Sequence, residues 1–92
     1  MGFGSKVMRK YKKFKDLVFE QVQNGYMAEL FFDNGLGIVV YRRTQFCDDP
    51  KRPYESAMIT SKGNLAFYTY NQSLREIAKF MKKIQKIPKG IF

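Results

Sequence analysis

The residue types that usually carry out chemistry are scarce in this chain. It has one cysteine, Cys47, and no histidine. Without histidine, nucleophile–imidazole pairs and zinc sites with imidazole ligands are excluded. Cys47 stands beside Asp48 and Asp49, whose negative charges disfavour a thiolate, and the two aspartates lack further oxygen ligands at the spacing of a metal site. We therefore expect no enzyme activity, no bound metal and no cofactor.

The glycine-rich stretch LFFDNGLGIVV, residues 30–40, is the second place to look for chemistry. A phosphate-binding Walker loop ends in Lys followed by Ser or Thr, and a dinucleotide-binding loop needs three glycines that open a helix. Neither pattern is present, and the β-branched run after Gly37 favours a strand. The stretch predicts two strands around a tight turn at Asn34-Gly35, with Gly37 at a bulge or a close backbone approach.

The charge of the chain is the strongest indication of its partner. Seventeen Lys and Arg against eight Asp and Glu give a formal net charge of +9 over 92 residues. Such an excess favours partners with negative surfaces: nucleic acid, a nucleoprotein complex or an acidic protein face. A lone cysteine favours the cytoplasm, and no apolar run is long enough to cross a membrane, so we expect a cytoplasmic protein without a membrane partner.

Turn signals divide the chain into short strands. Asn24-Gly25 suits the two central positions of a type I′ hairpin turn, and Lys62-Gly63-Asn64 marks another hairpin. We expect a strand from about residue 16 to 22 and further strands on either side of each turn. Residues 1–13 read as a basic N-terminal arm or short helix, and residues 14–92 as a single α+β domain.

The final element is predicted to be an amphipathic helix. Ser73 and Glu76 have the spacing of a capping box, so the helix should run from residue 74 to about 87 and stop at Pro88. Helical periodicity places apolar residues on one side: Leu74, Ile77, Ala78, Phe80, Met81 and Ile84. The opposite side is basic: Arg75, Lys79, Lys82, Lys83, Lys86 and Lys89.

These elements predict an α+β fold. We expect an antiparallel meander sheet of four to five strands, with the C-terminal amphipathic helix packed on one face. Alternation places Ala28, Leu30 and Phe32 on one face of their strand, and Ile38 and Val40 on one face of the next strand. Tyr68 and Tyr70 are either surface aromatics of the sheet or residues covered by the helix.

The hairpin also resembles a family of small phage-encoded proteins of largely unassigned function. The residues that carry the resemblance are Phe32-Asp33-Asn34-Gly35, Gly37, and Tyr54-Glu55 with Ala57, within a similarity that covers about residues 14–84. The resemblance implies a phage origin, the host cytoplasm as location and a shared fold, and it transfers no active site. Leu36 departs from the pattern because an aromatic residue is usual there, and the basic arm is an addition.

Three functions follow from these observations. The first is a non-enzymatic phage accessory protein that modulates or inhibits a host machine, such as a CRISPR effector or RNA polymerase. The second is direct nucleic-acid binding, with cations on phosphates and tyrosines stacked on bases. The third, an enzyme, has no motif to support it. For the first two we predict the same binding residues, in the helix, the arm, the loop after residue 41 and the last strand: Arg75, Lys79, Lys82, Lys83, Lys86, Arg9, Lys10, Lys12, Lys13, Arg42, Arg43, Lys51, Arg52, Tyr68 and Tyr70.

Overall fold

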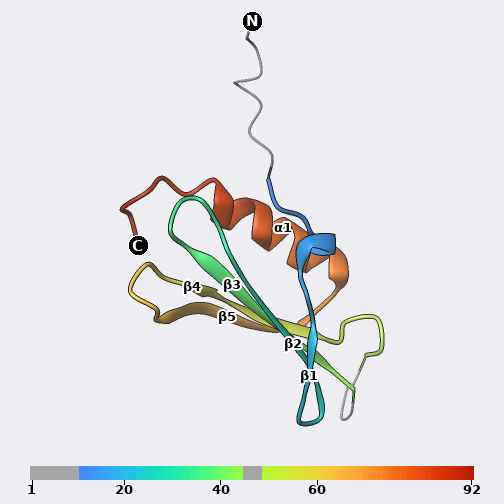
Figure 1. The fold of residues 1–92 in the computed structure, drawn as a ribbon. Coiled ribbons are helices and arrows are strands. Elements are labelled where there is room, and N and C mark those ends of the chain that lie inside the picture. The colour runs from blue at the N-terminus through green and yellow to red at the C-terminus, as the bar shows by residue number, and fades with distance from the viewer. Residues whose placement is uncertain (1–10, 45–48) are drawn as a thin grey trace, which may run out of the picture.

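The chain forms a five-stranded antiparallel meander with one helix across it. The computed structural model describes residues 11–44 and 49–92. The elements in order are η2 (Phe14–Asp16), β1 (Glu20–Val22), β2 (Gly25–Phe31), β3 (Gly37–Arg43), β4 (Tyr54–Ile59), β5 (Leu65–Gln72) and α1 (Leu74–Gln85). The strands lie in the order β1-β2-β3-β4-β5, and α1 crosses one face of the sheet (Figure 1). The predicted α+β architecture is therefore confirmed.

The core lies between α1 and the sheet. Strand register places Ala28 beside Val40, and Ile38 beside Met58, on the face that the helix covers. The buried cluster is Leu17, Ala28, Phe32, Leu36, Ile38, Val40, Met58, Ile77, Met81 and Ile84. Leu74, predicted on the apolar side of the helix, is 49% exposed. It is the first residue of α1, and the helix residues that bury fully against the sheet begin at Ile77.

The turn at Asn34-Gly35 joins β2 to β3 and also holds the end of the helix. The Gly35 N–H donates to Phe32 O (3.1 Å), the Phe32 N–H donates to Leu36 O (2.7 Å), and Gly35 has a φ of +88°. The Asn34 amide donates to Ile84 O (2.8 Å), in the last turn of α1, and to Ile87 O (2.9 Å), just beyond the helix. Ile84 O also accepts from the Ile87 N–H (3.1 Å), so Asn34 adds a second donor there. The predicted turn is confirmed, and it acts as a side-chain cap for α1.

The first hairpin differs from its prediction by one residue. Val22 pairs with Gly25, so the turn is made by Gln23 and Asn24, and only Asn24 (φ +63°) has a positive φ. The type I′ turn predicted with Asn24-Gly25 at its centre is therefore wrong. Gly25 is needed for a different reason, because a Cβ there would lie 2.3 Å from Arg42 O on the neighbouring strand. A Cβ on Gly37 would lie 2.8 Å from Leu30 O, which confirms the predicted close backbone approach.

The N-terminal part is less regular than predicted. In place of a strand from residue 16 to 22, a single 3₁₀ turn, η2, precedes the short strand β1. Asp16 closes this turn by accepting a hydrogen bond from the Lys13 N–H (2.7 Å), and the turn leads into the buried Leu17. Residues 11–13 form no helix, while residues 1–10 of the predicted arm lie outside the described residues.

Two irregularities interrupt the regular alternation of side chains along β5. Register shifts occur opposite β4, between Tyr54 and Ser56 and between Ser56 and Met58. Phe67 (φ +56°) and Asn71 (φ +52°) adopt left-handed backbone at these shifts, as residues in β-bulges do. Simple alternation therefore cannot be followed through β5.

The capping box at the start of α1 leads to a pH-dependent prediction. The Ser73 N–H donates to Glu76 Oε1 (2.7 Å), and the Glu76 N–H donates to Ser73 Oγ (3.2 Å), as predicted. The bond from the Ser73 backbone, and then that from Arg52, lower the pKa of Glu76 below its ordinary 4.5. A lowered pKa stabilises the fold above the unfolded pKa, and this contribution is lost as the pH falls through the folded pKa.

We therefore expect Glu76→Gln to be less stable than the parent chain at about pH 7, with the difference closing as the pH falls below 4.5 and through the lowered pKa of Glu76. Urea unfolding at a series of pH values measures this. Ser73→Ala is the matched control, because it keeps the Glu76 carboxylate and should cost about 1 kcal/mol of unfolding free energy. Its pH dependence should be the weaker of the two, since the Ser73 side chain makes the smallest contribution to the lowered pKa of Glu76. A Glu76→Gln deficit that does not change with pH would contradict the assignment.

Candidate polyanion-binding groove

A groove with a strongly basic lining runs between the segment 11–16 and helix α1. It has a volume of about 1080 Å³. The lining residues are Tyr11, Lys12, Lys13, Phe14, Lys15, Asp16, Arg75, Ala78, Lys79 and Lys82. Six of these ten are Lys or Arg and one is Asp, so the groove favours an anionic ligand. We call it the basic groove.

The first wall of the basic groove is the segment 11–16, and two hydrogen bonds hold it to the helix. Gln85 accepts a hydrogen bond from the Lys12 N–H (2.8 Å) and donates one to Lys12 O (2.9 Å). Gln85 is only 8% exposed and also donates to Met81 O, so its amide is fixed. Further along, the Phe14 ring packs against Phe19 (6.0 Å between centroids) and Tyr54 (5.5 Å). The backbone of this wall is thus positioned before any ligand arrives, which reduces the entropy lost on binding.

The second wall is the exposed side of α1. Arg75, Lys79 and Lys82 follow one another at spacings of four and three residues, so they project from the same side of the helix. All three are exposed, and Ile77 and Met81 on the other side are fully buried. Burial of the apolar stripe therefore orients the cations toward the groove.

The structure brings five of the predicted binding residues together in the basic groove. These are Lys12 and Lys13 from the arm, and Arg75, Lys79 and Lys82 from the helix. Tyr11, Phe14 and Lys15 also line it, although the sequence analysis did not include them among the binding residues. Lys15 could have been predicted, because it belongs to the same basic stretch as Lys12. The position of this stretch against α1 could not, because no local sequence pattern indicates it. Arg9 and Lys10 lie outside the described residues.

The other predicted cations lie elsewhere. Lys86 lines a smaller adjoining hollow, and Lys83 lines neither hollow. Arg42 and Lys51 are exposed in β3 and in the loop before β4. Neither residue lines the basic groove.

Two of the predicted cations have structural partners. Arg52 contacts the Glu76 carboxylate (Nη2–Oε1 2.8 Å) and donates to Asn71 O (2.8 Å), which ties the loop before β4 to the start of α1. Arg43 lies 3.2 Å from Glu55 Oε2 on the sheet face away from the helix. The ion pairs seen among the described residues use none of the cations of the basic groove.

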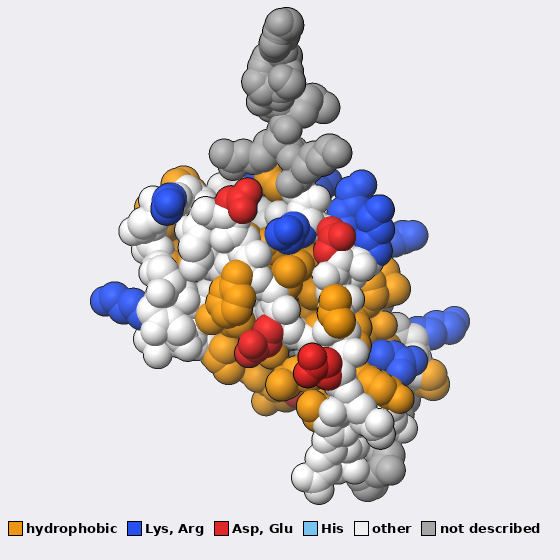
Figure 2. All heavy atoms as spheres, in the orientation of Figure 1, with side chains coloured by type: hydrophobic (Ala, Val, Ile, Leu, Met, Phe, Trp, Pro, Cys, Tyr) orange, Lys and Arg blue, Asp and Glu red, His pale blue; other side chains and the backbone are white. Residues whose placement is uncertain are grey.

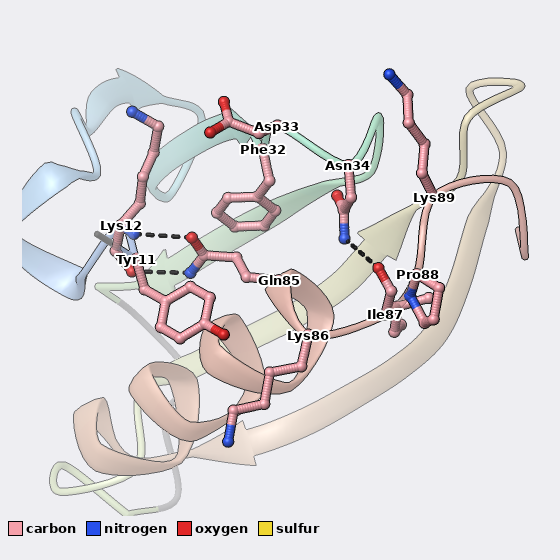
Figure 3. Close-up of a pocket in the computed structure, with 10 residues that line it drawn as sticks. All are labelled: Tyr11, Lys12, Phe32, Asp33, Asn34, Gln85, Lys86, Ile87, Pro88 and Lys89. Atoms are coloured by element: carbon pink, nitrogen blue, oxygen red, sulfur yellow. Dashed lines mark hydrogen bonds between the residues drawn. The ribbon is translucent and has the colours of Figure 1, made fainter. Parts of the chain in front are cut away.

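The smaller hollow continues the basic groove past Tyr11. Its volume is about 280 Å³, and Tyr11 and Lys12 line both cavities. Figure 3 shows Gln85 paired with the backbone of Lys12, and Tyr11 beside Gln85 and Lys86. Asn34 points to the end of the helix, where its amide bonds Ile87 O. Tyr11 therefore stands at the junction of the two cavities.

The face of the sheet opposite α1 is of a different kind. It exposes apolar side chains from β2 and β5: Met27, Phe31, Leu65, Tyr68 and Tyr70. On the side of the molecule that Figure 2 shows, hydrophobic side chains lie among Asp and Glu, and most Lys and Arg lie toward the periphery. Tyr68 and Tyr70 lie side by side, with 4.9 Å between ring centroids. Of the two alternatives predicted for these tyrosines, the structure shows the first: they are aromatic residues on the surface of the sheet. The sheet separates them from the basic groove.

The Tyr68 hydroxyl donates to the carboxylate of Glu55, a residue that is 9% exposed. This hydrogen bond, and then burial, raise the pKa of Tyr68 to about 12 from 10.0. A raised pKa stabilises the fold below the unfolded value, so the contribution is lost as the pH rises from about 10 to about 12.

We expect Glu55→Gln to bring the pKa of Tyr68 back toward 10, because it removes the charge that opposes ionisation. An NMR titration of the Tyr68 ring carbons measures this, with Tyr70→Phe as a control that keeps the Glu55 bond. A Tyr68 that already titrates near 10.0 in the parent chain would show that the hydrogen bond is absent in solution.

Searches for a metal site, a membrane span and similar proteins do not assign a function to the chain. Among the described residues, no group of three or more His, Cys, Asp or Glu could hold a metal ion. No helix within residues 11–44 and 49–92 is both long and apolar enough to cross a membrane. No family model, curated protein or solved structure matches the chain. The resemblance to phage proteins therefore stays a prediction.

Proposed function

We propose that this chain is a small binding protein, without a catalytic site of its own, that holds nucleic acid in the basic groove. The single observation that carries the proposal is the meeting of six cations from two distant segments around one cavity with a single acidic residue. Phosphates are the anionic groups that such a concave basic lining accommodates best. The pairing of Gln85 with Lys12 supports the proposal because it keeps the two basic walls together.

The biological setting that we propose is a nucleoprotein machine. If the phage resemblance holds, the chain is an accessory protein that modulates or inhibits a host assembly by occupying its nucleic acid. A CRISPR effector, with a guide RNA and a displaced DNA strand, and RNA polymerase are machines that present such strands. Occupation of a strand by the basic groove would then compete with the machine's own contacts.

A second candidate function is the binding of a protein partner through the open face of the sheet. The exposed apolar side chains on the open face of the sheet favour it, because apolar clusters of this kind often mark protein contacts. Such an interface would have a buried hydrophobic anchor and would lose less affinity in salt than phosphate binding does.

Fluorescence anisotropy with labelled RNA and DNA over a salt series tests the proposal. Neutralisation of about six phosphates of a single strand predicts a slope of about −4 for log K against log salt. Sub-micromolar binding at physiological salt with a slope of this size is the expected result. Binding that appears only at low salt would contradict the proposal and favour the protein partner.

A further inference from the structure

The two walls of the basic groove restrict the form of nucleic acid that it can hold. Lys12, Lys13 and Lys15 stand on one side and Arg75, Lys79 and Lys82 on the other. A ligand that lies inside the cavity can touch both sets. A duplex keeps its bases stacked and paired, and proteins usually approach it with an element that enters one of its grooves. A single strand is narrower and can lie between the walls.

The cavity also has room for bases. Its volume, about 1080 Å³, lies just above the range of small-molecule pockets, about 300–1,000 Å³. Proteins that bind single strands combine a positive groove with aromatic side chains on which bases stack. Tyr11 and Phe14 are the aromatic residues of this lining.

Of these two rings, Tyr11 is the one without an aromatic partner among the described residues. The Phe14 ring packs edge-on against Tyr54, at 5.5 Å and 75°, and also contacts Phe19. Within the described part of the chain, Tyr11 takes part in none of the ring pairs. Its side chain is half-buried beside Gln85 and Lys86, where the larger and smaller cavities meet (Figure 3).

We infer that the ligand of the basic groove is single-stranded nucleic acid, with an unpaired base stacked on the Tyr11 ring while the six cations contact phosphates. The inference rests on the proposed function and adds the strandedness of the ligand and the residue that contacts a base. Stacking on one aromatic side chain changes affinity by about tenfold.

The test uses the full chain and three labelled oligonucleotides of about 12 nucleotides, a length within the range of single-strand sites. They are a mixed-sequence single strand, the same sequence as a duplex, and a single strand with abasic positions at its centre. Each is titrated with the parent chain, Tyr11→Ala and Tyr11→Phe. Tyr26→Ala is the matched control, because Tyr26 is 36% exposed and lies in β2, where it pairs with Arg42 of β3.

We expect the single strand to bind at least about tenfold more tightly than the duplex, and the abasic strand to bind about tenfold more weakly than the intact one. Tyr11→Ala should remove the difference between intact and abasic strands, and Tyr11→Phe should keep it. Equal binding of duplex and single strand, or of intact and abasic strands, would overturn this inference while the proposed function stands. Failure of all three probes to bind at physiological salt would overturn both.

Discussion

Reversal of three charges in the basic groove should abolish binding of nucleic acid. In the variant Arg75→Glu, Lys79→Glu and Lys82→Glu, one wall of the groove becomes acidic while the other stays basic. Loss of three phosphate contacts and the new repulsion should weaken binding by about 100-fold or more at physiological salt. Anisotropy with a labelled single strand measures the change. The apolar side of α1 is untouched, so circular dichroism should show an intact fold.

A second triple variant separates the groove from net charge. Lys51→Glu, Lys62→Glu and Lys83→Glu change the formal charge by the same amount at exposed positions outside the basic groove. Each set includes one lysine from the last turn of α1, which matches the effect on the helix dipole. The control should lose only the few-fold affinity that follows from a less positive protein. Equal losses in the two variants would show that binding depends on overall charge, without a defined site.

Replacement of the three groove cations by glutamine tests the same contacts through the salt slope. Each phosphate contact contributes about 0.7 to the slope for a single strand, so the neutral variant should show a slope of about −2, against about −4 for the parent. A neutral variant with the parental slope would mean that these side chains contact no phosphate.

Asn34→Ala should destabilise the fold more than an ordinary turn substitution does. The side chain donates to Ile84 O and Ile87 O and accepts from the Leu36 N–H (3.1 Å), so one amide joins the β2–β3 turn to the end of α1. Its loss removes these three hydrogen bonds, two of which join the turn to the end of α1, and should cost about 2 kcal/mol of unfolding free energy. For a domain of this size the melting temperature should fall by roughly 10 °C.

The β4–β5 turn supplies the matched control for Asn34. Its backbone is similar: the Gly63 N–H donates to Thr60 O (2.9 Å), the Thr60 N–H donates to Asn64 O (2.7 Å), and Gly63 has a φ of +87°. Lys62 holds the position equivalent to Asn34 and is exposed. Lys62→Ala should therefore change stability by no more than about 0.5 kcal/mol. Similar effects of the two substitutions would contradict the capping role of Asn34.

Asn34→Asp distinguishes the hydrogen bonds from the shape of the side chain. It keeps an oxygen for the Leu36 N–H but places a carboxylate against the carbonyl oxygens at the negative end of the helix. We expect it to be at least as unstable as Asn34→Ala near neutral pH.

The sequence predicted the fold well because its signals are local. The Asn34-Gly35 turn, the capping box of Ser73 and Glu76, and the periodicity that buries Ile77 and Met81 each depend on neighbouring residues. The errors occurred where packing overrides local preference. Gly25 is required by its contact with the backbone of β3, a neighbour that turn statistics do not include.

The candidate site was predicted only in part because it is a tertiary feature. The cations of α1 and those of the arm were each visible as clusters, but the Gln85 side chain that brings Lys12 to the helix lies 73 residues away in sequence. In the sequence, Arg43 and Arg52 look like the other predicted binding cations. Only the structure shows that each of them pairs with a carboxylate. The face on which Tyr68 and Tyr70 lie could not be predicted by alternation because β5 contains two register shifts, and the hydrogen bond of Tyr68 to Glu55 shows that face.

The most direct test of the central claim is an NMR titration of the ¹⁵N-labelled chain with a short single-stranded oligonucleotide at physiological salt. A chain of 92 residues is well suited to it. We predict shifts of the backbone amides along both walls of the basic groove, residues 11–16 and 75–82, while Met27, Phe31 and Tyr70 on the open face of the sheet stay unchanged. Shifts confined to the open face, with the groove unaffected, would contradict the assignment of the basic groove as the binding site.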